Sequence, residues 1–247
     1  MERFKVVSES NSDITFTVKF PQLHYLNEFI RLKCAPDLLG NGLFPNVKEI
    51  TETMAAFNAV RKYMGVESFA DNKIILFDVG CGHAPRNAAL FAHMTSWNCH
   101  AIDPVLRKKG KFLRTKRLSL HPCRIEDYAG AISGDTIIIL AVHAHINLET
   151  ALKKFNAPRM VVIAMPCCNR LEIKDCKPIK HYDDLGCLSP MREVKIFDLV
   201  RVPKKSPLHE VKVGDRFFTD EADYGLGTIV SFNEMEGKSQ YDDNGCG

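Results

Sequence analysis

The chain has 247 residues, of which 45% are hydrophobic and 26% charged, and a formal net charge of +3 at pH 7. This length suits one α/β domain with additions, and the composition allows a sizeable core. The charge is too small to identify a nucleic-acid-binding protein by itself. No apolar run could cross a membrane, and residues 1–5 begin no signal-peptide pattern. Nine cysteines, an odd number in a chain this long, predict reduced thiols and an intracellular, cytoplasmic location.

Residues 1–70 form an extension before the main pattern of the chain. Alternating apolar residues predict a strand over 13–20, and the spacing over 24–34 suits a short amphipathic helix. Apolar residues at helical spacing predict a longer helix over 47–63. Such helices either form a wall of a substrate site or only cover a sheet, and the sequence leaves both readings open.

Strands and helices alternate over residues 71–203, which predicts an α/β Rossmann-like domain with a mostly parallel sheet. Helices are expected over 85–94 and over 147–155, the second with Asn147 as its N-cap. Continuous apolar runs, such as 136–142, suit central strands that are buried on both faces. The expected strands are 73–78, 98–103, 118–123, 136–142, 159–165 and, as a sixth, 193–202.

Residues 204–240 form a C-terminal β segment, and the polar residues 241–247 predict a mobile tail. Two further strands are expected, over 216–219 and 228–232. Either of them pairs antiparallel with the sixth strand as a closing hairpin, or the two belong to a small β appendage.

The stretch after the first core strand carries the strongest motif. Asp78 ends an apolar run and is followed by Gly80 and Gly82, then by a predicted helix. Two glycines without a Cβ permit a tight turn and a close approach to a ligand at the carboxyl end of a parallel strand. Dinucleotide sites place a third glycine where Pro85 stands, which argues against NAD. An ordinary strand-to-helix turn is the alternative.

The D-x-G-x-G-x-A pattern from Asp78 to Ala84 resembles the first motif of class I S-adenosylmethionine (SAM) methyltransferases. Asp103 ends the next strand, 21 residues after Gly82, where such folds place the carboxylate that binds ribose hydroxyls. A solvated loop aspartate is the other reading of Asp103. Because the two motifs are in register, we predict SAM as the cofactor.

Residues 135–144 and 161–168 resemble a methyltransferase subgroup that has a Pro-Cys-Cys fifth motif and includes tRNA 2′-O-methyltransferases. The sequence departs from that subgroup at His145 and Ile146, where Cys-Gly is usual. The resemblance implies a seven-stranded class I sheet and an RNA substrate. It also implies that Ile125 and Glu126 contact adenine. The alternative for Glu126 is that its side chain caps a helix. The cofactor residues that it implies are Asp78, Gly80, Cys81, Gly82, Asp103, Ile125, Glu126, Ala141 and Val142.

Histidines and cysteines follow the fourth and fifth strands, whose carboxyl ends face the same crevice in such a sheet. His143 or His145 is the expected catalytic base, because imidazole titrates near neutral pH. Cys167, Cys168 and Asn169 are expected to shape the pocket floor on the substrate side. Zinc bound by both histidines and both cysteines is the alternative. The spacing fits no standard zinc module, so we predict no metal.

The densest basic segment follows Asp103 and includes Arg107, Lys108, Lys109 and Lys111. Such a segment attracts phosphates, although a solvated surface helix would look the same. We therefore predict a SAM-dependent methyltransferase acting on RNA, with no membrane association. A small-molecule or protein substrate is an alternative, as is a non-catalytic assembly module with a protein partner.

Overall fold

The computed structural model describes residues 2–7, 13–18, 23–107, 115–130, 132, 134–168, 170–201, 216–218, 226–233 and 238–241. Side chains are described between residues 23 and 201 of these ranges. Within this part of the chain, no helix combines the length and the apolar character that crossing a membrane requires.

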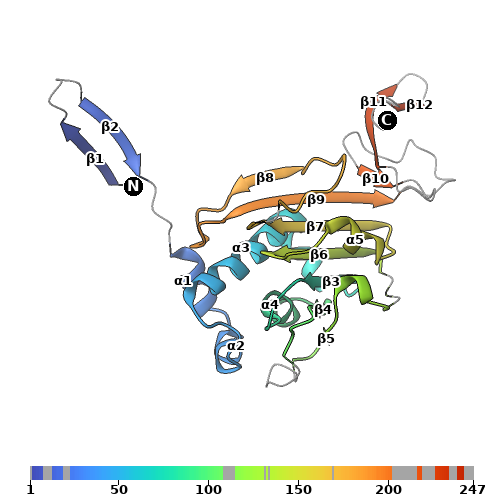
Figure 1. Ribbon diagram of the computed structural model, residues 1–247, viewed down its shortest axis with the longest axis horizontal. Coiled ribbons are helices and arrows are strands. Elements are labelled where there is room, and N and C mark those ends of the chain that lie inside the picture. Colours follow the sequence, from blue (N-terminus) through green and yellow to red (C-terminus); the bar gives the residue numbers. More distant parts are fainter. Residues whose placement is uncertain are drawn as a thin grey trace.

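The predicted Rossmann-like α/β sheet is confirmed. Strands β3 to β7 run parallel, and β9 lies antiparallel to β7, with β8 paired antiparallel to β9 (Figure 1). The strand order is β5-β4-β3-β6-β7-β9, with β8 beyond β9. These seven strands are β3 (Ile74–Val79), β4 (Asn98–Ile102), β5 (Leu118–His121), β6 (Thr136–Val142), β7 (Arg159–Met165), β8 (Lys180–Asp183) and β9 (Glu193–Arg201).

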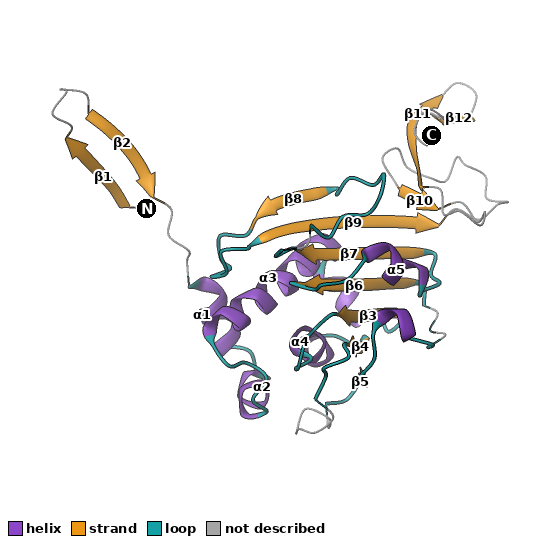
Figure 2. Cartoon of the chain, viewed as in Figure 1, coloured by secondary structure: helices purple, strands orange, loops and turns teal. Residues whose placement is uncertain are grey.

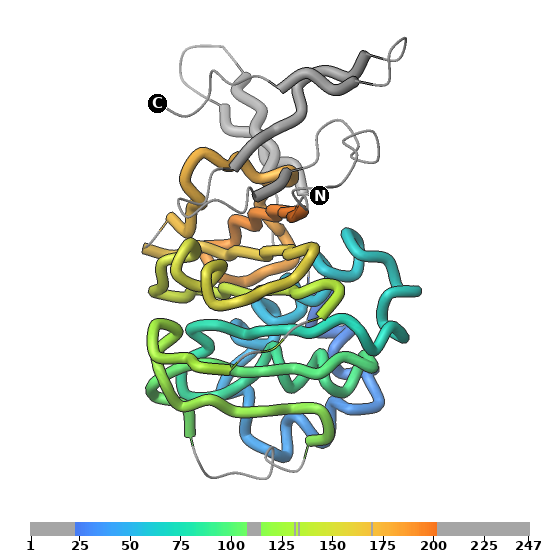
Figure 3. The backbone as a smooth tube through the Cα atoms, turned by 90° about the vertical axis from the view of Figure 1, so that its right-hand side faces the viewer, coloured from blue at the N-terminus to red at the C-terminus, as the bar shows by residue number. Residues whose placement is uncertain are grey.

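The central strands are buried on both faces and separate two apolar cores. Ile74 and Leu76 of β3 pack into one core, and Ile75 and Phe77 into the other, because successive side chains alternate across a sheet. The four N-terminal helices and α5 (Leu148–Lys153) contribute to opposite cores (Figures 2 and 3). The first group comprises α1 (His24–Ile30), α2 (Ala35–Gly40), α3 (Val47–Met64) and α4 (Arg86–Met94).

Two helices have an asparagine as N-cap, because the amide oxygen of its side chain can accept a hydrogen bond from a backbone N–H in the first turn. The Asn147 side chain accepts a hydrogen bond from the Thr150 backbone N–H, which confirms the predicted N-cap of α5. Asn46 caps α3 in the same way through Glu49. The helix predicted over 24–34 is present but ends earlier, at Ile30, and a second helix that was not predicted begins at Ala35. Pro36 lies in the first turn of this second helix, where a proline is tolerated.

β8 and β9 form an antiparallel hairpin at the end of the sheet. β8 was not predicted from the sequence, because it is short, polar and largely exposed at an edge. β10 (Arg216–Phe218) pairs parallel to β9, so it is not the antiparallel partner of β9 that one of the two alternatives for the C-terminal segment expected. It continues antiparallel into β11 (Leu226–Asn233), which pairs with β12 (Lys238–Tyr241).

β1 (Glu2–Val7) and β2 (Asp13–Val18) form a separate antiparallel pair, of which only β2 was predicted. The tail expected over 241–247 lies outside the described residues except for Tyr241.

The chain reverses direction across the sheet between β3 and β6. From β3 it proceeds outward through β4 and β5, and then returns to β6 on the other side of β3. Ligands of open α/β sheets bind at such a reversal, beside the carboxyl ends of the strands. The fold therefore directs attention to the loops that follow β3, β4 and β6.

Candidate functional site

A cavity of about 520 Å³ lies beside the carboxyl ends of β3, β4 and β6. Its volume is in the range of small-molecule and cofactor sites, about 300–1,000 Å³. Three loops from non-adjacent parts of the chain meet there, together with the short 3₁₀ turn η3 (Ile125–Asp127). The lining residues are Val79, Gly80, Ile102, Asp103, Pro104, Arg124, Ile125, Glu126, His143, His145 and Ile146.

The glycine loop forms one side of this cavity. Gly80 and Gly82 both have φ of +70°, a left-handed conformation that favours glycine. A Cβ at residue 80 would lie 2.7 Å from the Ala144 Cβ, so glycine allows the loops after β3 and β6 to approach closely. A Cβ at residue 82 would meet no atom within 4 Å. Gly80 is thus required by packing and Gly82 by backbone conformation.

Asp103 joins the second strand tip to the glycine loop. Its Oδ2 accepts a hydrogen bond from the Gly82 backbone N–H at 2.8 Å, and its Oδ1 accepts one from Val105 at 2.9 Å. The Gly80 N–H also donates to the Ile102 carbonyl at 2.8 Å. A carboxylate oxygen has a second acceptor site, so Asp103 retains capacity to bind ligand hydroxyls at the cavity wall.

Asp78 lies outside the cavity lining, unlike the position that the resemblance implies. It is fully buried, and its carboxylate accepts hydrogen bonds from the Asn87 side chain and the Ala88 backbone N–H. These bonds hold the first turn of α4. Burial raises the pKa of Asp78 to about 6. Cys81 is also buried, outside the lining, and burial raises the pKa of its thiol.

Ile125 and Glu126 line the cavity from η3, at the positions expected to contact adenine. Glu126 lies within the turn rather than at its N-cap, which is Arg124. Ala141 is buried in the sheet and outside the lining. Val142 lines a second cavity instead.

The second cavity, of about 210 Å³, adjoins the first at His143, which lines both. Helix α3 supplies much of its wall, so this N-terminal helix both covers the sheet and lines a cavity. The lining is polar and carries both signs of charge. Its residues are Lys48, Glu49, Glu52, Thr53, Arg86, Asn87, Val142 and His143.

His143 forms an ion pair with Glu52, a residue that the sequence analysis did not single out. His143 Nε2 lies 2.9 Å from Glu52 Oε1, and Lys48 Nζ lies 2.8 Å from the same oxygen. Burial disfavours the imidazolium, but contact with Glu52 outweighs it and raises the pKa of His143. Burial likewise disfavours the Glu52 carboxylate, but His143 and Lys48 outweigh it and lower its pKa. The sequence held one signal for Glu52, which is the polar run Thr51-Glu52-Thr53 within an amphipathic helix. All three residues are buried in the structure.

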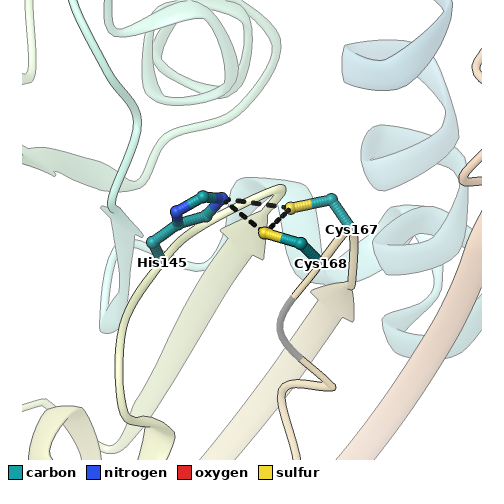
Figure 4. A group of neighbouring side chains, drawn as sticks. All are labelled: His145, Cys167 and Cys168. Carbon is teal, nitrogen blue, oxygen red and sulfur yellow. Dashed lines mark hydrogen bonds between the residues drawn. The ribbon is translucent and has the colours of Figure 1, made fainter.

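His145, Cys167 and Cys168 form a cluster where the loops after β6 and β7 meet (Figure 4). His145 Nε2 lies 3.3 Å from Cys167 Sγ and 3.1 Å from Cys168 Sγ. The backbone N–H of His143 donates a hydrogen bond to the Met165 carbonyl at 2.8 Å, and this bond joins the ends of β6 and β7. His145 lines the larger cavity, whereas neither cysteine lines either cavity. The expected pocket-floor role of the cysteines is therefore not seen in these two cavities, and Asn169 lies outside the described residues.

Only part of the basic segment falls within the described residues. Arg107 is exposed after the Asp103 turn, and Lys108, Lys109 and Lys111 lie outside them. Arg117 has a structural role, because its guanidinium donates to the Ala92 and Thr95 carbonyls at the end of α4. Cations at helix C-termini stabilise the unsatisfied carbonyls there.

No family model and no curated protein sequence matches this chain. Among solved structures, a mutant of MtNAS in complex with S-adenosylmethionine aligns over 73% of this chain and 72% of its own, at 12% identity and a TM-score of 0.46. The N-methyltransferase NodS from Bradyrhizobium japonicum aligns over 60% of this chain and 94% of its own, at 14% identity and a TM-score of 0.40. The 16S rRNA methylase RmtB aligns over 73% of this chain and 75% of its own, at 16% identity and a TM-score of 0.39.

Proposed function

We propose that the protein is a SAM-dependent methyltransferase that uses the cavity at the ends of β3, β4 and β6. The observation that carries this proposal is the pairing of the glycine loop after β3 with Asp103 at the tip of the neighbouring β4, beside the sheet reversal. Asp103 would bind the ribose hydroxyls, and Ile125 and Glu126 the adenine. The space beside Gly80 would take the methionine end, while Gly82, outside the lining, orients Asp103 through its backbone N–H.

The chain's own residues supply positioning and a proton acceptor. SAM, when bound, would supply an electrophilic methyl group, with its sulfonium sulfur as the leaving group. Alignment of acceptor and methyl group accounts for much of the rate in such reactions. His143 lies between the two cavities and would take the acceptor's proton once its imidazole is neutral. Glu52 holds the imidazole from the side of α3.

RNA is the acceptor class that we propose first. It rests on the resemblance of residues 135–144 and 161–168 and on the basic segment from Arg107 to Lys111. Changing Lys108, Lys109 and Lys111 to Glu would weaken RNA binding and flatten its salt dependence, because fewer counterions are released on binding. An unchanged slope of log K against log salt would separate this segment from RNA.

The second cavity favours a small polar molecule as the other acceptor class. About 210 Å³ admits a compact molecule, and the lining offers Glu49, Glu52, Lys48 and Arg86 as charged partners. Product formation from SAM with total RNA, compared with a panel of small amines and acids, would distinguish the classes.

Calorimetric titration with SAM and S-adenosylhomocysteine tests the cofactor proposal, with NAD as the negative control. We expect micromolar binding of the first two and none of NAD. Asp103→Asn should weaken SAM binding by about 1–3 kcal/mol, because an acceptor to the ribose is lost. Asp135→Asn is the matched control, since Asp135 is exposed and precedes β6 at the opposite edge. Absence of SAM binding by the folded protein would overturn the proposal and favour a non-catalytic module.

A further inference from the structure

The cluster of His145, Cys167 and Cys168 contains the donor atoms of a soft-metal site. The three atoms concerned, one imidazole nitrogen and two sulfurs, all lie within 4.8 Å of one another. We propose that these side chains bind a zinc-class divalent ion through His145 Nε2 and the two Sγ atoms. This proposal goes beyond the methyltransferase activity and stands on different residues from those that would bind SAM.

The spacing of the donor atoms agrees with tetrahedral coordination. With Zn–S of about 2.3 Å and Zn–N of about 2.0–2.1 Å, a tetrahedral ion holds two sulfurs about 3.8 Å apart and a sulfur and a nitrogen about 3.5 Å apart. The two sulfurs here are 3.7 Å apart. The imidazole nitrogen is 3.3 and 3.1 Å from them, so the exposed His145 ring would withdraw by a few tenths of an ångström to admit the ion.

The local backbone explains how adjacent cysteines present both sulfurs to one point. β7 ends at Met165, and the turn that follows directs Cys167 and Cys168 toward the same imidazole (Figure 4). At 3.7 Å the sulfurs are not joined by a disulfide bond, whose length is about 2.05 Å. This arrangement revises the sequence-based expectation of no metal, which rested on a spacing that fits no standard zinc module.

Three protein ligands leave one position open in a tetrahedral site, which is the arrangement of catalytic rather than structural zinc. His145 lines the larger cavity, so the ion would lie at the edge of the space proposed for SAM. A thiol or a water molecule bound at the open position would lose its proton readily, because a metal ion lowers the pKa of its ligands. The site would therefore bind an exchangeable ligand beside the cavity.

Titration of the reduced, full-length protein with Co²⁺ alone tests the proposal. We expect one equivalent to bind, with a thiolate-to-cobalt charge-transfer band and the visible absorption of tetrahedral cobalt, and Zn²⁺ to displace it. Cys167→Ser, Cys168→Ser and His145→Ala should each weaken binding at least 10-fold. Cys123→Ser is the matched control, because Cys123 is a half-buried cysteine outside the cluster. Octahedral spectra, or binding that survives the Cys167→Ser and Cys168→Ser changes, would overturn the proposal.

A second measurement addresses the open position. Addition of a small monothiol to the cobalt-loaded protein should change the visible spectrum, since the thiol would replace water on the ion. An unchanged spectrum would show that the site is closed by a fourth protein ligand. Neither measurement requires SAM, so failure here and failure of the proposed function are distinguished by the calorimetric titration.

Discussion

The two sides of the main cavity are held together by different physical means. The glycine-loop side is fixed by backbone N–H groups, the Asp103 carboxylate and a close approach of Gly80 to Ala144. The side lined by His143 and His145, in the loop after β6, is held from behind by the Glu52–His143 ion pair and by the contacts of the His145 imidazole with Cys167 and Cys168. One side therefore depends on backbone shape, whereas the other depends on protonation.

Gly80→Ala should produce the largest effect on the glycine-loop side. A left-handed alanine and a Cβ 2.7 Å from the Ala144 Cβ together predict a loss of about 2–5 kcal/mol in the free energy of unfolding. Gly82→Ala is the matched control: its φ is the same but its Cβ meets nothing, so about 1–2 kcal/mol is expected. Urea unfolding of both variants measures the difference. Equal losses would show that the approach to Ala144 is unimportant.

Glu52→Gln should affect the protonation-dependent side. Removing the carboxylate lowers the pKa of His143, so the pH midpoint of the methyl-transfer rate should move down. The free energy of unfolding should fall by about 1–3 kcal/mol near neutral pH, as a charged partner is lost inside the protein. Glu49→Gln is the control, because Glu49 lies on the same helix as Glu52 but pairs with Arg86 of α4. An unmoved midpoint with intact activity would remove His143 from the proton transfer.

The pH dependence of stability has a definite sign for each partner of this pair. Folding lowers the pKa of Glu52, so its contribution to the free energy of unfolding is present above pH 4.5, its pKa in the unfolded chain. This contribution is lost as the pH falls through the pKa of Glu52 in the folded state. Folding raises the pKa of His143, so its contribution is complete below pH 6.5 and is lost as the pH rises through the pKa of His143 in the folded state. Glu52→Gln should flatten both limbs of the stability curve.

Asp78→Asn should change the pH dependence of stability on the glycine-loop side. The pKa of Asp78 is about 6 in the folded state, whereas an unperturbed aspartate has a pKa of 3.8. Folding is therefore accompanied by proton uptake at pH values between these two. The Asp78 contribution therefore lowers stability as pH rises from about 4 to 6. The variant should lose this slope when unfolding is followed across that range, with Asp135→Asn as the surface control. A slope that persists in Asp78→Asn would assign it to another group.

Local patterns predicted the glycine-loop side better than its opposite. The apolar run before Asp78, the two glycines and the position of Asp103 are short-range signals, and they predict a strand, a turn and a second strand tip. Glu52 pairs with His143 from a helix that precedes the sheet, and no local pattern links them. β8 was missed because its polar residues owe their strand conformation to pairing with β9. The burial of Asp78 and the helix-end role of Arg117 likewise depend on tertiary contacts.

His143 is the only residue common to the linings of the two described cavities. The cavities of about 520 and 210 Å³ thus meet at one residue, whose imidazole is held by Glu52 and whose backbone N–H is held by the Met165 carbonyl. Because this residue is also the proposed proton acceptor, any substitution at position 143 would alter the shape of both cavities and the acid–base chemistry together. An engineer who wished to change acceptor size alone would leave His143 in place and vary its neighbours.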